Sequence, residues 1–266
     1  MIIHQRDATW WFKMNGAARL AIVKGALNGF TKPVVLTEYP KSGGTWLSQM
    51  ISAALEIPYP RNRLPHLSSQ IIHGCYLNVN KNIDTVVVWR DGRDTMVSFY
   101  YHLMFEKPIT SSRFSKRLRG LLSASDPHDI QKLLPAFIEW TFNGGYPRYS
   151  WATFVDKWKL NSPRITTSYE SINENPSEEL KRVLTLLGRS DISTSSIDTI
   201  VHEFSFEKQS SRKPGDEDVK SFVRKGIVGD WKNVFNDECR ELFNHYAGEQ
   251  LISLGYEKNS DWVNNK

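Results

Sequence analysis

The chain has 266 residues, and its 40% of hydrophobic side chains is enough to build a full core without disulfide or metal staples. Its net charge of +5 suits an anionic ligand, yet no run of five or more basic residues indicates an arm that binds nucleic acid. Two cysteines, no apolar run of about 18 residues and no signal-peptide pattern at the N-terminus favour a cytoplasmic protein without stable membrane insertion.

Residues 1–30 form the first predicted element, an N-terminal helix. Apolar and aromatic side chains, among them Trp10, Trp11 and Leu20, recur at helical spacing with basic residues between them. A helix lying on a membrane surface would have a similar pattern. A helix packed against the rest of the chain explains the pattern better, because the basic face is thin.

A strand, a tight turn and a helix follow, and the chain is organised around them. Residues 34–38 (VVLTE) indicate a buried strand, and residues 47–55 have a helical pattern. In the turn, Gly43 and Gly44 permit positive φ angles and a close approach of the backbone to a ligand. Backbone N–H groups and the positive end of the helix dipole then point at one spot, to which Lys41 adds a full positive charge. The segment therefore predicts an anion cradle.

This turn differs from a Walker A loop, in which the lysine follows the second glycine. Here Lys41 precedes both glycines, so it must approach a phosphate chain from a different position. Taken alone, an ordinary turn with a chance lysine explains the segment as well as a phosphate site does.

Strands and helices alternate along the rest of the chain, which predicts a parallel sheet flanked by helices. Ligands of such sheets bind at the carboxyl ends of the strands. Lys41, His73 and Arg90 each follow a predicted strand, so we expect them to face one crevice. The further predicted strands are 69–76, 85–89 and 164–169, and the further predicted helices are 149–158, a helix capped by Ser177 and ended by Gly188, 193–206 and 236–254.

Three segments carry the polar motifs of the chain. They are residues 39–46 (YPKSGGTW), Arg90 with Ser98 eight residues later, and residues 224–233 (RKGIVGDWKN). In this order they resemble the motifs of the sulfotransferases that use 3′-phosphoadenosine 5′-phosphosulfate (PAPS). The family's 5′-phosphosulfate loop is usually written YPKSGTTW, and its C-terminal segment RKGxxGDWKN.

The resemblance implies one α/β domain over residues 1–266, with a P-loop-like strand, loop and helix that bind the phosphosulfate. It also implies that a sulfuryl group moves from PAPS to a hydroxyl or amine of a small-molecule acceptor, with 3′-phosphoadenosine 5′-phosphate (PAP) as product. The transition state is loose and in line, so positioning and charge stabilisation dominate, and no metal is implied. Residues 106–150 are expected to form a helical cap on the acceptor side, and residues 207–223 a mobile lid loop.

The resemblance also assigns roles to individual residues. Lys41 is expected to stabilise the charge that develops on the leaving PAP. Trp46, Tyr169 and Phe206 resemble the residues around adenine and its ribose, although core packing explains these aromatics too. The expected ligands are Ser42, Gly43, Gly44 and Thr45 for the 5′-phosphate, and Arg90, Ser98, Arg224, Lys225 and Gly226 for the 3′-phosphate. Arg93, beside Asp91 and Asp94, is interpreted as a further ligand or as a member of a surface ion pair.

The general base, which removes the proton of the hydroxyl or amine that receives the sulfuryl group, is the weakest point of the resemblance. A histidine suits this task near neutral pH. The family carries it in a K-[ST]-H-x-P segment, and strict alignment puts Cys75 at that histidine and His73 at the lysine. His73 from a shifted position is the predicted base, His66 is the second candidate, and a purely structural histidine is the alternative.

Two other functions remain possible at this stage. An ATP-dependent P-loop kinase is opposed by the position of Lys41 and by the Arg90–Ser98 pair. A PAPS-binding protein without transferase activity is suggested by the displaced histidine. The family's dimerisation motif, K-x-x-x-T-V-x-x-x-E, is not matched after residue 233, so the oligomeric state stays open.

Overall fold

A computed structural model describes residues 5–26, 31–105, 118, 120 and 126–264. The chain divides into two compact units. The first unit comprises Met1–Glu38, Gly43–Trp89 and Pro163–Phe204. The second comprises Tyr39–Ser42, Arg90–Ser162 and Ser205–Lys266.

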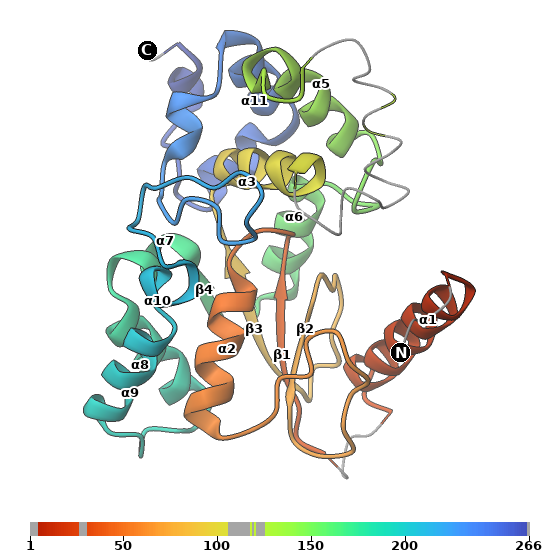
Figure 1. Ribbon diagram of the computed structural model, residues 1–266, viewed down its shortest axis with the longest axis vertical. Helices are drawn as coiled ribbons and strands as arrows, with labels where there is room; N and C mark the ends of the chain where they lie inside the picture. The colour runs from red at the N-terminus through yellow and green to blue at the C-terminus, as the bar shows by residue number, and fades with distance from the viewer. Residues whose placement is uncertain (1–4, 27–30, 106–117, 119, 121–125, 265–266) are drawn as a thin grey trace. The chain divides into compact units, whose positions relative to one another are not determined.

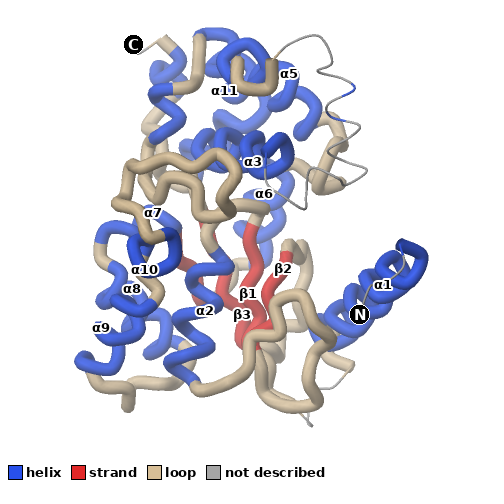
Figure 2. The backbone as a smooth tube through the Cα atoms, viewed as in Figure 1, coloured by secondary structure: helices blue, strands red, loops and turns tan. Residues whose placement is uncertain are grey.

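The first unit contains a parallel four-stranded sheet, drawn in red in Figure 2. Its strands are β1 (Val34–Glu38), β2 (Ile71–Gly74), β3 (Asp84–Trp89) and β4 (Ile165–Ser168), in the order β2-β1-β3-β4. All three neighbouring pairs are parallel. The predicted α/β class, with helices flanking a parallel sheet, is confirmed.

Side chains of β1 alternate between two hydrophobic clusters, one on each face of the sheet. Because both faces are covered, the first three residues of this central strand are all apolar. Val34 and Leu36 pack with residues of α2 (Gly44–Leu55), α8 (Pro176–Leu186) and α9 (Thr194–Glu203). Val35 packs instead with Ile22 and Val23 at the end of α1 (Gln5–Val23) and with residues in or beside β2 and β3. Figure 1 shows α1 on the β2 side of the sheet. A short helix, α7 (Tyr169–Glu174), follows β4 directly.

The N-terminal helix is confirmed over Gln5–Val23, whereas residues 1–4 and 27–30 lie outside the described part of the chain. It packs through its C-terminal end, yet Trp10 is 62% exposed and Leu20 44% exposed. A search of the described residues finds no helix that is long and apolar enough to span a membrane.

The second unit consists of helices and loops in its described residues. Tyr39, the first residue after β1, lies in its aromatic core against Phe99, Tyr149 and Phe154. Of the predicted cap, residues 106–117, 119 and 121–125 lie outside the described part. The described elements are α3 (Gly92–Phe105), α5 (Ile130–Phe142), α6 (Trp151–Asn161), α10 (Phe206–Ser210), η2 (Asp230–Asn233), α11 (Asp237–Ser253) and η3 (Ser260–Val263).

Two predicted helix boundaries differ from the structure. Asn175 precedes the first residue of α8, and Pro176 occupies the first helical position, where its missing N–H costs nothing. The predicted cap, Ser177, instead donates its hydroxyl to Asp198 Oδ1 at 2.6 Å. The helix expected over 193–206 is two helices, because Ser205 caps a new one, α10, by accepting the N–H of Lys208.

Candidate active site

The loop after β1 has the backbone geometry of an anion cradle. Lys41 and Gly43 have φ angles of 73° and 95°. A positive φ angle is uncommon for a residue other than glycine, such as Lys41. Gly44 starts α2, whose first turn contains no acidic residue, although the N–H of Gly44 itself donates to Oε2 of Glu38 at 2.6 Å. The local sequence therefore produces the strand, turn and helix N-terminus that it predicts.

Lys41 and Arg90, which follow two neighbouring strands, both belong to the second unit and lie together. Arg90 Nη1 donates to the backbone oxygen of Lys41 at 2.8 Å. The ammonium of Lys41 lies 3.8 Å from the ring centroid of Phe222 and donates to the Phe222 carbonyl at 3.3 Å. The predicted lid residue Phe222 is thus a direct neighbour of the predicted catalytic lysine.

In the first unit, Gly43 packs against Tyr169. A Cβ atom at Gly43 would lie 2.7 Å from the Tyr169 ring, so the position requires glycine for space as well as for its φ angle. Trp46 meets Tyr169 with ring centroids 6.2 Å apart. The three residues form one apolar and aromatic surface beside the start of α2.

Buried polar atoms along the loop fit an anionic ligand. Ser42 Oγ and Trp46 Nε1 are buried and have no hydrogen-bond partner within the described residues. Such atoms are uncommon in folded proteins, and a bound ligand, ion or water molecule is one way in which they gain a partner. The predicted donor set of hydroxyls and cations therefore suits a phosphosulfate. No group of three or more metal-ligating side chains is found where the chain is described.

Two of the three basic residues predicted for the 3′-phosphate, Arg224 and Lys225, form ion pairs with carboxylates. Arg224 Nη2 lies 2.5 Å from Asp230 Oδ2, and Lys225 Nζ lies 2.6 Å from Asp230 Oδ1. Arg224 also pairs with Glu217 of the predicted lid and lies over the Tyr101 ring, 4.6 Å from its centroid. Burial alone would raise the pKa of Asp230, but Lys225 and Arg224 outweigh it and hold that pKa below its ordinary value.

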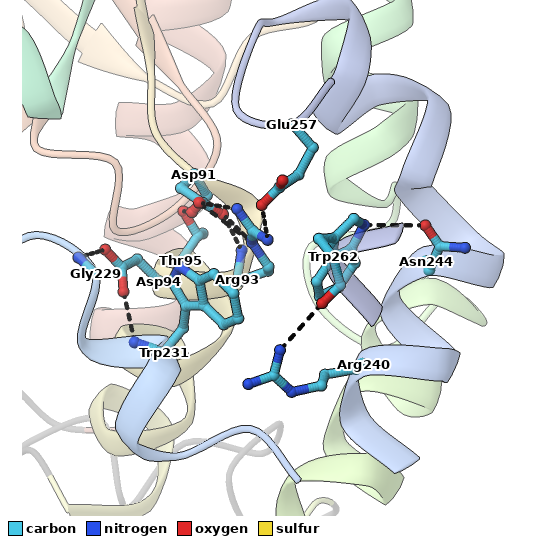
Figure 3. A network of polar contacts seen from close by, with 10 residues as sticks. All are labelled: Asp91, Arg93, Asp94, Thr95, Gly229, Trp231, Arg240, Asn244, Glu257 and Trp262. Atoms are coloured by element: carbon cyan, nitrogen blue, oxygen red, sulfur yellow. Dashed lines mark hydrogen bonds and ion pairs between the residues drawn. The ribbon is translucent and has the colours of Figure 1, made fainter. Parts of the chain in front are cut away.

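The segment around these residues is shaped by close packing. A Cβ atom at Gly226, whose φ is 67°, would overlap the ring of Phe206. Phe206 and Gly226, both predicted nucleotide residues, are therefore in contact. Asp94 of α3 accepts the backbone N–H groups of Gly229 at 2.7 Å and Trp231 at 2.9 Å (Figure 3).

Arg93 forms a buried ion pair, not the surface pair expected as one alternative. Its guanidinium bonds Asp91 at 2.7 Å and Glu257 at 2.5 Å. It also lies 3.7 Å from the ring centroid of Trp231 and 4.6 Å from that of Trp262 (Figure 3). With only 2% of the side chain exposed, these contacts give Arg93 a structural role.

His73, the predicted base, lies at the end of β2 with both ring nitrogens engaged. Nδ1 is 2.8 Å from the hydroxyl of Tyr59, and Nε2 is 2.8 Å from Oε1 of Glu38. Two other residues considered at the sequence level, His66 and Cys75, are exposed. Glu38 was missed by sequence reasoning, although a carboxylate at the end of a buried apolar strand is an unusual feature that marks it.

Comparison with known proteins relates the chain to sulfotransferases. The sequence model described as "Sulfotransferase domain" matches residues 52–255. The chain is 26% identical to sulfotransferase 1A1 of Rattus norvegicus, covering 84% of this chain and 87% of that one. It is also 26% identical to sulfotransferase 1C2 of Homo sapiens, covering 79% and 80%.

Solved structures share the fold. Mouse sulfotransferase SULT7A1 complexed with PAP superimposes with a TM-score of 0.64 at 20% identity, covering 95% of this chain and 94% of that chain. Retinol dehydratase in a complex with retinol and PAP gives a TM-score of 0.59 at 15% identity, covering 90% and 86%. Since the sequence model matches well over half of the chain, this protein belongs to the sulfotransferase domain family.

Proposed function

We propose that this protein transfers the sulfuryl group of PAPS to a hydroxyl or amine of a small-molecule acceptor. The observation that carries the proposal is the loop at residues 39–46, in which Lys41 and the buried Ser42 Oγ, without a hydrogen-bond partner in the described residues, precede α2 in the chain. The relatives' shared activity supports it, as does PAP in the two similar structures. Two cysteines that form no disulfide support the cytoplasm as the location.

The nucleotide is held by the residues that the motifs identify. Ser42 and Thr45 donate hydroxyls to the 5′-phosphate, together with the backbone N–H groups of Gly43 and Thr45, since the N–H of Gly44 donates to Glu38. Arg90, Ser98, Arg224 and Lys225 bind the 3′-phosphate, for which the planar fork of arginine is well suited. Adenine lies against the aromatic residues Trp46, Tyr169 and Phe206.

The chemistry needs one cation and one base. Lys41 stabilises the negative charge that develops on the oxygen between sulfur and the 5′-phosphate. His73 takes up the proton that the acceptor loses as it attacks. The positive side chains of the site do what Mg²⁺ does in kinases, so the reaction needs no metal. The loop at residues 207–223, which carries Phe222 beside Lys41, closes over the bound nucleotide.

Two experiments test the proposal. PAP should raise the melting temperature and ATP should not, because ATP lacks the 3′-phosphate. Purified protein with PAPS should then sulfate at least one member of a panel of phenols, alcohols and amines. Stabilisation by ATP alone would point to a kinase, and PAP binding without any turnover would point to a PAPS-binding protein.

A further inference from the structure

Glu38 joins three groups of the first unit into one hydrogen-bonded chain. Its Oε2 accepts the N–H of Gly44 at 2.6 Å, and its Oε1 lies 2.8 Å from Nε2 of His73. On the other side of the imidazole, Nδ1 lies 2.8 Å from the hydroxyl of Tyr59. Glu38 is 5% exposed, so its carboxylate needs these partners.

The chain of contacts fixes which nitrogen of His73 carries the proton. An ionised carboxylate only accepts hydrogen bonds, so Nε2 must donate its N–H to Glu38. The lone pair is then on Nδ1, and the hydroxyl of Tyr59 donates to it. A proton can therefore reach the basic nitrogen of His73 only through Tyr59, as long as these contacts persist.

Gly44 makes room for this arrangement. A Cβ atom there would lie 2.7 Å from Cδ of Glu38 and 2.8 Å from Nε2 of His73. The phosphosulfate loop of the family is usually written with threonine at this position. In this chain the pair of Glu38 and His73 occupies the space that a side chain at residue 44 would need.

Tyr59 lies next to a predicted ligand of the phosphosulfate. Burial raises the pKa of Tyr59 above its ordinary value, against the charge of Arg61 and the hydrogen-bonding side chains of Thr45 and Ser48. The phenol thus stays protonated at neutral pH and can donate to His73. Its hydroxyl is beside Thr45, at the start of the helix that is proposed to hold the 5′-phosphate.

We propose that Tyr59, His73 and Glu38 form a proton relay for sulfuryl transfer, an inference that rests on the proposed function. As the acceptor's oxygen or nitrogen forms a bond to sulfur, its proton passes to the Tyr59 hydroxyl. The hydroxyl's own proton passes to Nδ1 of His73. The bond from sulfur to the 5′-phosphate oxygen breaks, and its electron pair leaves with PAP. Tyr59 is the catalytic residue that touches the acceptor, and Glu38 is a positioning residue that stabilises the imidazolium.

The substitution Glu38→Gln tests the positioning role without any acceptor. The amide keeps the shape, and its oxygen can still accept from Gly44, but its NH₂ group must now donate to Nε2. The tautomer of His73 should therefore invert, and Nδ1–H should donate to Tyr59. Long-range ¹H–¹⁵N spectra of the ring at about pH 8, above the ordinary titration range of imidazole, report this directly. An Nδ1–H or doubly protonated ring in the wild type, or no inversion in the variant, would overturn the assignment.

Kinetics with an acceptor found in the panel test the relay itself. Tyr59→Phe and His73→Ala should each lower kcat by about 10²–10³-fold, within the range for loss of an acid–base group. The double variant should be no slower than either single variant, because residues that act as one unit are non-additive. Glu38→Gln should lose kcat similarly, and PAP affinity should stay nearly unchanged in all of them.

Glu179→Gln is the matched control, because its carboxylate also pairs within the first unit, with Arg182 and Thr167, away from His73. It should retain kcat. If the wild type turns over and Tyr59→Phe keeps kcat within a few-fold of the wild-type value, His73 acts directly on the acceptor. That result refutes the relay and leaves the proposed function standing. A wild type without turnover on any acceptor refutes the proposed function and the relay with it.

Discussion

Lys41 combines an uncommon backbone angle with a side chain held over Phe222. Non-glycine residues with positive φ cost free energy and gather at functional sites. Lys41→Ala should lower kcat by about 10²–10³-fold, the usual loss for one contact that stabilises transition-state charge. The melting temperature should hardly change, and the exposed Lys81→Ala is the control that should keep full activity. Activity of Lys41→Ala within a few-fold of wild type would remove the lysine from the mechanism.

Arg224 and Arg90 are the residues expected to distinguish two phosphates from one. Calorimetry should show that Arg224→Ala and Arg90→Ala each weaken PAP far more than adenosine 5′-phosphosulfate, which lacks the 3′-phosphate. A charge-assisted contact is worth about 1.5–3 kcal/mol, or roughly ten- to over a hundred-fold in affinity. Equal losses for both ligands would mean that neither arginine contacts the 3′-phosphate.

At the scale of one residue, the loop after β1 could be predicted from the sequence, but the contact between Glu38 and His73 beside it could not. Lys41, Gly43 and Gly44 lie within a continuous turn, so local rules were enough to identify them. Glu38 and His73 are 35 residues apart and meet because β1 pairs with β2 in a particular register, with Leu36 opposite His73. No local pattern encodes that register.

At the scale of the element, the segment from Arg224 to Asp230 is held by charge. The pKa of Asp230 lies below its ordinary value because Lys225 and Arg224 outweigh burial, so the ionised carboxylate stabilises the folded state. This contribution is fully present above the unfolded-state pKa of about 3.9 and is lost as the pH falls through the lower folded-state pKa.

The substitution Asp230→Asn should therefore destabilise the protein at neutral pH. The difference in unfolding free energy between wild type and variant should shrink once the pH falls below about 4. Urea unfolding at a series of pH values measures this difference. A gap that stays constant from neutral to acidic pH would show that the charge of Asp230 contributes nothing.

The N-terminus of α3 depends on the buried Arg93. Removing one partner of a buried ion pair leaves an uncompensated charge and costs about 3–5 kcal/mol. Arg93→Ala should approach that loss, since Asp91 and Glu257 lose their cation and the two indole rings lose their neighbour. Arg189→Ala, which breaks an exposed pair with Asp191, should change stability little in the same denaturant titration. Similar small losses for both variants would contradict the structural role of Arg93.

Elements were easier to predict than their ends. β1 and β3 have strong apolar patterns, and the structure places them, like α11, within a few residues of the prediction. Helix caps were harder, because Asn175, Pro176 and Ser177 all suit a helix start and only packing selects among them. The Arg93 cluster required contacts with Glu257 and Trp262 near the other end of the chain, which no local rule supplies.

For the whole molecule, the net charge of +5 and the cations assigned to the nucleotide have one common consequence. PAP carries two phosphate groups, so its binding should weaken severalfold with added salt. Between about 0.01 and 1 M salt the Debye length falls from about 30 Å to about 3 Å, which screens the general attraction and leaves the close contacts. Titrations across this range should show a clear loss for PAP and almost none for uncharged adenosine. Arg224→Ala should reduce the salt dependence as well as the affinity. If PAP and adenosine responded to salt alike, the affinity would come from the aromatic residues around adenine, and the assignment of the cations would fail.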